Sequence, residues 1–135
     1  MDQYQSIDDF FSQIFKDLNC GRMTRAYITS VFSKYKRSNC DLSDQSLTIL
    51  YMNASGKKDF ATYQNIGDWI FFHKSIDSTH LNHASQDYYN TLAQMSYYGC
   101  YKITNRQIKY YEEMADRFVS ITKEAKEKLK ISITL

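Results

Sequence analysis

The chain of 135 residues contains no proline and only four glycines, and this feature constrains its fold more than any other. Proline and glycine interrupt helices and mark turns between strands, so long stretches of this sequence are free to be helical. The apolar residues recur at intervals of three and four, which is the spacing of one helix face, rather than alternating as in a strand. The sequence therefore predicts an all-α fold, in which residues 1–135 form a single-domain bundle of five to six helices.

Six segments carry this helical spacing. Ser6 and Asp9 resemble a capping box at the start of the first helix, and Gly21 is expected to end it. Ser43 or Asp44 is expected to cap the third helix, which Gly56 closes. The other helices are expected at about 23–37, 59–74 and 80–99, with a long C-terminal helix that follows a second capping box at Thr104 and Gln107 and ends near Leu129. Residues 131–135 alternate apolar and polar, so they are expected to fray or to form a short extended tail.

The C-terminal helix carries apolar or small residues spaced alternately by three and four, a heptad-like seam. This seam serves either packing within the bundle or self-association, and its residues are Tyr111, Ala115, Phe118, Thr122, Ala125 and Leu129. The chain also holds twelve tyrosines and eight phenylalanines, residue types that are enriched at protein interfaces. The leading hypothesis is a non-enzymatic protein that uses this helix face to bind another protein or a second copy of itself.

Nucleic acid is an alternative partner. The 17 basic residues barely outnumber the 15 acidic ones, so the net charge of +2 does not dictate a partner. The second predicted helix nevertheless has a basic side that would meet phosphate groups, formed by Arg22, Arg25, Lys36 and Arg37. A regulator that binds nucleic acid through this side is possible but not favoured, because domains that grip duplexes are usually far more basic.

A metal-dependent enzyme is the third hypothesis. At about 100° per residue, His80, His83 and Asp87 fall within a narrow sector of the fifth predicted helix, and three ligands with one open position are typical of a catalytic zinc site. His73 is a further ligand candidate. Metal sites in helical bundles usually draw ligands from several helices, often as Glu-x-x-His motifs, and this chain has no such motif. No cofactor is therefore expected.

Asp68 lies in the interior of the most apolar predicted helix, between Gly67 and Trp69. A buried carboxylate needs a hydrogen-bond or charge partner, so Asp68 either pairs with a Tyr hydroxyl, an Arg or a helix N-terminus, or faces a cleft as an active-site acid. The structural role is favoured, because Gly67 lets another helix approach closely. The sequence shows no nucleophile motif and no glycine-rich phosphate loop, so an enzymatic role is uncertain and a non-enzymatic one preferred.

Three groups of residues between positions 60 and 129 form a wider pattern. They are Ile66-Gly67-Asp68 with Phe71-Phe72, Tyr88-Tyr89 with Leu92 and Tyr97, and Tyr111 with Met114-Ala115 and Phe118. In these positions the chain resembles a set of uncharacterised bacterial all-helical proteins with an (I/L)GD-x-x-(L/F)F pattern. It departs from them at Lys74, where they have a glycine before a Phe-Pro pair, and at Ala93, which replaces another glycine. The resemblance implies a helical fold and no particular activity.

The cysteines and the apolar runs bear on location. Cys20, Cys40 and Cys100 are an odd number with no close-spaced pair, which favours a reducing compartment. No apolar stretch follows a basic start, and the longest apolar run, from Trp69 to Phe72, is far shorter than the about 20 residues that span a bilayer. We expect a cytoplasmic protein with no membrane partner.

Overall fold

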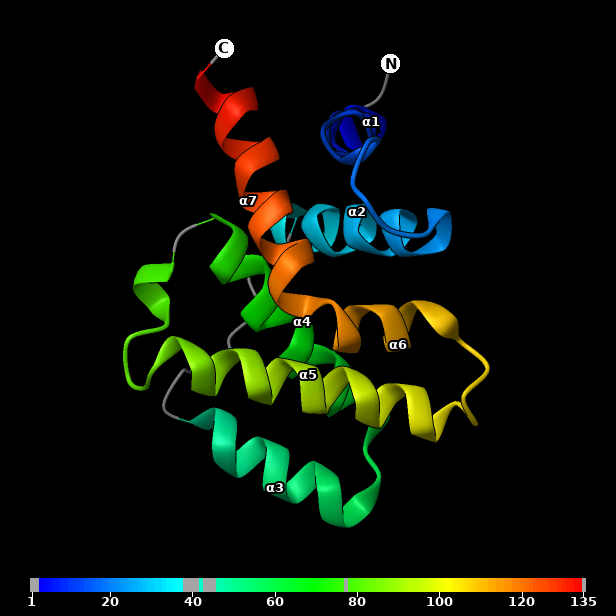
Figure 1. Cartoon of the computed structure of the whole chain (residues 1–135), viewed down its shortest axis with the longest axis vertical. Coiled ribbons are helices and arrows are strands. Elements are labelled where there is room, and N and C mark those ends of the chain that lie inside the picture. The colour runs from blue at the N-terminus through cyan, green and yellow to red at the C-terminus, as the bar shows by residue number, and fades with distance from the viewer. Residues whose placement is uncertain (1–2, 38–41, 43–45, 77, 135) are drawn as a thin grey trace.

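The computed structural model describes residues 3–37, 42, 46–76 and 78–134, and over these residues it is helical without strands, which confirms the all-α class (Figure 1). The described residues form seven α-helices, slightly more than the five to six expected, and one short 3-10 helix. The elements are α1 (Gln3–Phe15), α2 (Arg22–Arg37), α3 (Leu47–Lys57), α4 (Phe60–Ile76), η2 (Ser78–His80), α5 (Gln86–Ile103), α6 (Lys109–Asp116) and α7 (Phe118–Thr134).

Helix α4, which corresponds to the most apolar helix expected from the sequence, lies at the centre of the bundle. It packs against α2, α3, α5 and α7. Its buried residues lie on more than one side of the helix, and they are Tyr63, Ile66, Gly67, Asp68, Trp69, Ile70, Phe71 and Ser75. A helix that is buried on several sides must be covered by several neighbours, which places the core of the molecule around α4.

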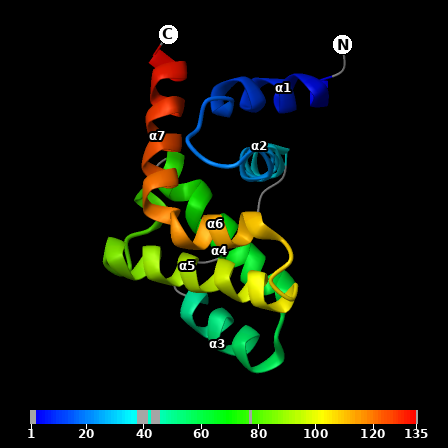
Figure 2. The same ribbon diagram turned by 45° about the vertical axis from the view of Figure 1, so that its right-hand side comes forward.

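Helices α1 and α3 lie at opposite ends of the molecule in both views (Figures 1 and 2). Helix α1 packs on α2 and α7, and its Phe15 ring lies 4.9 Å from the ring of Phe32 in α2, between centroids. Helix α3 packs mainly on α4 and, to a smaller extent, on α5. Each of these two helices is therefore covered on one side only by the rest of the bundle.

The long C-terminal helix predicted from the sequence is divided in the structure. Helix α6 ends at Asp116, Arg117 has a non-helical φ of −115°, and α7 begins at Phe118. The turn keeps backbone hydrogen bonds on both sides, because the amide of Arg117 donates to Glu113 and that of Ile121 donates to Arg117. The apolar spacing continues through Arg117, so periodicity alone did not reveal this break.

Several predicted helix ends are also wrong. Helix α1 begins at Gln3, so Ser6 and Asp9 lie within it, and it ends at Phe15, well before Gly21. Helix α5 continues past Gly99 and ends at Ile103. Gly99 therefore lies within the helix, and the ring of Tyr63 packs against it. The Thr104 hydroxyl donates to the carbonyls of Cys100 and Tyr101, so it closes α5 instead of opening α6, whose N-cap position is Ile108.

The ends of α3 and α7 differ from expectation as well. Ser43 and Asp44 lie outside the described residues, and the residue before α3 is Ser46. Helix α3 runs one residue beyond Gly56, and it is Lys58 that takes the left-handed conformation, with a φ of 52°. Residues 131–134 belong to α7 and form neither a frayed nor an extended tail, while residue 135 lies outside the described residues.

Candidate interaction surface

The heptad-like seam does not form an accessible contact face. Its six residues are all buried, with at most 7% of any of them exposed, and they are Tyr111, Ala115, Phe118, Thr122, Ala125 and Leu129. The Phe118 ring lies 6.1 Å from that of Phe71 and 6.3 Å from that of Tyr97, between centroids. Because these rings belong to α4 and α5, the seam serves packing within the bundle, and the prediction of an interaction face there is wrong.

Asp68 lies at the centre of the bundle, where only 2% of the residue is exposed. Its Oδ1 accepts hydrogen bonds from the hydroxyls of Tyr27 and Tyr97 at 2.6 and 2.7 Å, and Nζ of Lys34 lies 3.6 Å from Oδ2. Burial raises the pKa of the Asp68 carboxyl, whereas the two hydroxyls and Lys34 oppose that rise because they stabilise the charged form. The carboxylate is therefore paired, as the favoured interpretation predicted.

Gly67 makes this arrangement possible. A Cβ atom at Gly67 would lie 2.9 Å from the ring of Tyr97, which is closer than two carbon atoms can pack. The missing side chain thus lets α5 approach α4 until the Tyr97 hydroxyl reaches Asp68, which confirms the close approach expected from the sequence.

The predicted metal ligands do not share a helix face. His80 ends η2, His83 lies in the loop that follows, and Asp87 lies in the first turn of α5. The helix begins only at Gln86, because the Ser85 hydroxyl accepts a hydrogen bond from the amide of Tyr88 and so caps it. Across the described ranges, no group of three or more His, Cys, Asp or Glu side chains is placed to hold a metal ion. The proposed three-ligand face is therefore wrong, although the rings of His73 and His80 do lie 4.7 Å apart.

The four basic residues proposed for nucleic acid form two separate pairs at opposite ends of α2. Arg22 and Arg25 lie in the first turn of α2, whereas Lys36 and Arg37 are its last two residues. In a helix of 16 residues the two pairs are about 20 Å apart along the axis. Arg25 donates to the carbonyls of Leu18 and Cys20, and Arg37 forms an ion pair with Asp8 at 2.9 Å. Two of the four side chains thus have roles within the molecule.

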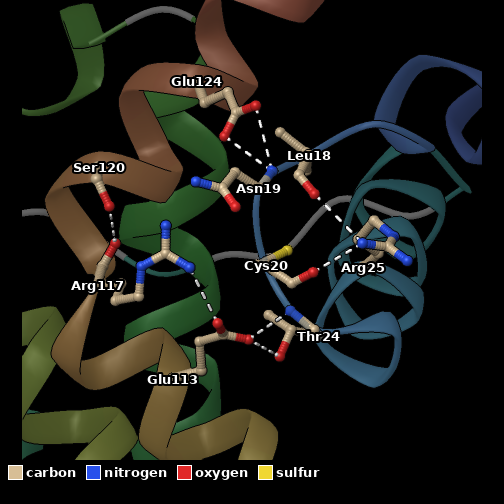
Figure 3. A network of polar contacts seen from close by, with 10 residues as sticks. Leu18, Asn19, Cys20, Thr24, Arg25, Glu113, Arg117, Ser120 and Glu124 are labelled. Atoms are coloured by element: carbon tan, nitrogen blue, oxygen red, sulfur yellow. Dashed lines mark hydrogen bonds and ion pairs between the residues drawn. The ribbon is translucent and has the colours of Figure 1, made fainter.

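Two carboxylates of the C-terminal half hold the loop between α1 and α2 in place (Figure 3). Glu113 of α6 accepts hydrogen bonds from the amide of Gly21 at 2.9 Å and from the hydroxyl of Thr24 at 2.6 Å, and it pairs with Arg117 at 3.0 Å. Both carboxylate oxygens of Glu124, from α7, accept from the amide of Asn19. These contacts join residues about one hundred positions apart, so the network is a structural clamp between the two halves of the chain.

The charge of Glu113 suits this position. It lies at the N-terminus of α2, where the helix dipole favours a negative group. Burial by itself would raise the pKa of the Glu113 carboxyl, but the hydrogen bonds from Thr24 and Gly21, together with Arg117, outweigh it and lower that pKa. Glu113 therefore caps α2 in its ionised form.

An open cleft of about 670 Å³ lies between α3 and α5. Three tyrosines and three basic side chains contribute to its walls, together with smaller and apolar residues, and the described residues that line it include no carboxylate. The lining comprises Tyr51, Ser55, Lys58, Tyr63, Met95, Tyr98, Gly99, Lys102, Ile103, Asn105 and Arg106. Aromatic rings beside cations and an absence of acidic groups distinguish this cleft from a neutral crevice between helices.

Exposed apolar side chains flank this cleft. On α5, Met95 and Tyr98 are 45% and 42% exposed, and on α3, Ile49 and Met52 are 63% and 67% exposed. We name these four residues the α3–α5 surface. A helix advances about 100° per residue, so Met52 lies about 60° around α3 from the cleft residue Ser55, and Ile49 lies about 60° further. The apolar surface thus continues from the edge of the cleft onto the outward side of α3.

The sequence interpretation missed this surface. Leu47, Leu50, Tyr51 and Ala54 recur at helical spacing and form the stripe of α3 that packs on the core, whereas Ile49 and Met52 lie outside that stripe. Apolar residues that do not fit a helix's own buried stripe were the available indication. The basic residues of the cleft had no such indication, because Lys58, Lys102 and Arg106 are brought together only by packing.

Comparison of the chain with protein-family models, with curated proteins and with solved structures gives no match. The resemblance of residues 60–129 to uncharacterised helical proteins therefore stays a prediction, as does the cytoplasmic location. Within the part of the chain that the structure describes, no helix combines the length and the apolar character needed to cross a bilayer.

Proposed function

We propose that this chain is a non-enzymatic protein–protein interaction domain that binds a different protein through the α3–α5 surface. The observation that carries the proposal is the exposure of Ile49 and Met52, since about two-thirds of each residue is open to solvent. Both residues belong to α3, which packs on the bundle by one side only. The hypothesis of an interaction protein is thus kept, and its contact face moves from the buried seam to α3.

The composition of α3 supports this role. Five of its first six residues are apolar, yet only Leu47 among those five is fully buried. Single exposed apolar residues are common on protein surfaces, but a short helix that is apolar around most of its circumference usually has a second contact to make. Methionine and tyrosine are enriched in interface cores, and the flexible methionine side chain adapts to varied partner surfaces.

The charge beside this surface favours a different protein over a second copy. Two-fold dimers bury the same patch on both subunits, so a dimer formed here would bring the cations of both cleft linings toward each other. Repulsion between like charges would oppose that dimer, whereas a partner with acidic side chains would be attracted.

The test compares two double alanine variants. Ile49→Ala/Met52→Ala removes apolar contact area from α3, and the control Val119→Ala/Ile131→Ala removes similar area from α7, where the two side chains are 53% and 57% exposed. Alanine favours helix formation, so neither variant should lose stability. Proteins captured by the wild type from a lysate of the organism that carries the gene would be identified, expressed and measured against all three proteins by calorimetry.

We expect a purified partner that binds the wild type and the α7 control with equal affinity and binds the α3 variant at least tenfold more weakly. If every captured protein binds the α3 variant as tightly as the wild type, the proposal is wrong. Self-association of the wild type in sedimentation that the α3 variant abolishes would also contradict it, because the occupant would then be a second copy.

A further inference from the structure

We infer that the cleft between α3 and α5 takes an acidic, amphipathic peptide segment, whose carboxylates meet Lys58, Lys102 and Arg106 and whose apolar side chains cover Met95 and Tyr98. This inference rests on the proposed function and specifies the chemistry of the partner.

The first argument is the distribution of charge. Helices α3 and α5 both run toward the same side of the molecule, on the right of Figure 1, and Lys58 and Arg106 lie just beyond their last turns. Both residues have positive φ values, 52° and 59°, at the points where the chain turns away from its helix. A helix C-terminus carries about half a negative charge, so two of them offset only about one of the three cations. Among the residues that line the cleft, an excess of about two positive charges therefore remains. Asp59, the neighbour of Lys58, is not part of the lining, and its carboxylate accepts hydrogen bonds from the amide and hydroxyl of Thr62.

The second argument is the way in which the cleft presents Lys102. Its Nζ lies 5.5 Å from the centre of the Tyr98 ring, a cation–π contact that holds the ammonium group beside an exposed aromatic face. Met95, Tyr98 and Lys102 follow one another at spacings of three and four, so they form one stripe along α5. A partner that crosses this stripe meets apolar side chains and a cation in sequence, which matches a segment that carries both apolar and acidic groups.

The third argument is the rigidity of the cleft floor. Tyr63 is 7% exposed, and its ring lies so close to α5 that a Cβ atom at Gly99 would come within 2.9 Å of it. The floor is therefore fixed by the packing of α4 against α5. A partner gains from such a preformed site, because little conformational order has to be created when it binds.

The lining favours a protein segment over a nucleic acid strand. Single strands are bound by grooves that follow the phosphate backbone with a row of basic residues over several nucleotides. Here the three cations gather at one end of the cleft, and Met95, further along the exposed side of α5, is apolar. The whole chain carries a net charge of only +2. Apolar anchors with a single cluster of charges are instead typical of a groove that binds an amphipathic helix.

The experiment measures the binding of fluorescent synthetic peptides by anisotropy. The probes are a Leu/Glu peptide with apolar residues at helical spacing, the same peptide with Lys in place of Glu, a scrambled Leu/Glu peptide, and a thymidine oligonucleotide. They are measured against the wild type, against Lys102→Gln/Arg106→Gln, and against a control of equal charge, Lys16→Gln/Lys36→Gln, whose two lysines are exposed elsewhere.

We expect the wild type to bind the Leu/Glu peptide at least tenfold more tightly than any other probe. The cleft variant should lose about tenfold of this affinity, from two surface charge contacts, and the control less than twofold. Equal binding of the Leu/Lys peptide, tighter binding of the oligonucleotide, or no effect of the cleft variant would overturn the inference. A natural partner that depends on Ile49 and Met52 but not on Lys102 and Arg106 would leave the proposed function intact while refuting this inference.

Discussion

Replacing Tyr97 with phenylalanine removes a single hydroxyl from the centre of the bundle. That hydroxyl donates a 2.7 Å hydrogen bond to Oδ1 of Asp68, the oxygen that also accepts from Tyr27. A hydrogen bond to a charged group contributes about 1.5–3 kcal/mol to the free energy of unfolding. Asp68 is too deeply buried for bulk solvent to supply a donor in place of the Tyr97 hydroxyl. We expect Tyr97→Phe to lower the free energy of unfolding at neutral pH by about 2 kcal/mol, and the melting temperature by about 8 °C.

The loss should depend on pH. Burial holds the pKa of Asp68 above its ordinary value of 3.8 in the folded protein, so the folded state binds this proton more tightly than the unfolded state. Stability from this group therefore rises as the pH falls through the folded-state pKa toward the unfolded value. Tyr97→Phe removes a donor that favours the charged form, so it raises the folded-state pKa further. The difference in free energy of unfolding between the variant and the wild type should be largest at pH values above the folded-state pKa of Asp68 in both proteins. It should shrink as the solution becomes acidic.

Urea unfolding followed by circular dichroism over a range of pH measures both effects. The matched control is Tyr89→Phe, which removes the hydroxyl of an equally buried tyrosine, and that hydroxyl accepts a hydrogen bond from the amide of His83. This neutral bond is worth about 1 kcal/mol, and its loss should not change with pH through Asp68. A loss below about 0.5 kcal/mol for Tyr97→Phe, or a loss that is constant with pH, would refute a charged Asp68 held by Tyr97.

Two further predictions concern close packing and the clamp. Gly67→Ala should lower the free energy of unfolding by about 1–2 kcal/mol because its Cβ meets the Tyr97 ring, whereas Gly56→Ala, with no atom within 4 Å, should raise it by about 0.5–1 kcal/mol. Chemical denaturation of both variants checks this, and changes of the same sign would contradict it. Glu113→Gln should cost about 1 kcal/mol at neutral pH by weakening the cap on α2. The folded-state pKa of Glu113 is lowered from 4.5, so its contribution to stability is fully present above pH 4.5 and is lost as the pH falls through the folded-state pKa. The melting curves of the variant and the wild type should therefore converge in acid.

The sequence by itself determined the helical class, identified the most apolar helix and favoured a paired Asp68. Periodicity is a property of neighbouring residues, and an amphipathic pattern without proline has few alternatives to a helix. The apolar run around Ile66 and Trp69 could be covered only from several sides, so it had to lie at the centre. Pairing was the favoured role for a carboxylate in such a run, and Gly67 marked the place where a neighbouring helix could come close.

Helix ends and the covered side of each helix were decided by tertiary structure. The seam from Tyr111 to Leu129 has the spacing of an interface, yet α4 and α5 bury it, and nothing in the spacing distinguishes an internal neighbour from an external one. The cleft between α3 and α5 joins positions 51–63 to positions 95–106, which become neighbours only when both helices pack on α4. Local sequence fixes which residues share a face, because that depends on helix pitch. Which faces meet depends on the combined packing of elements far apart in the chain, and this left Ile49 and Met52 uncovered.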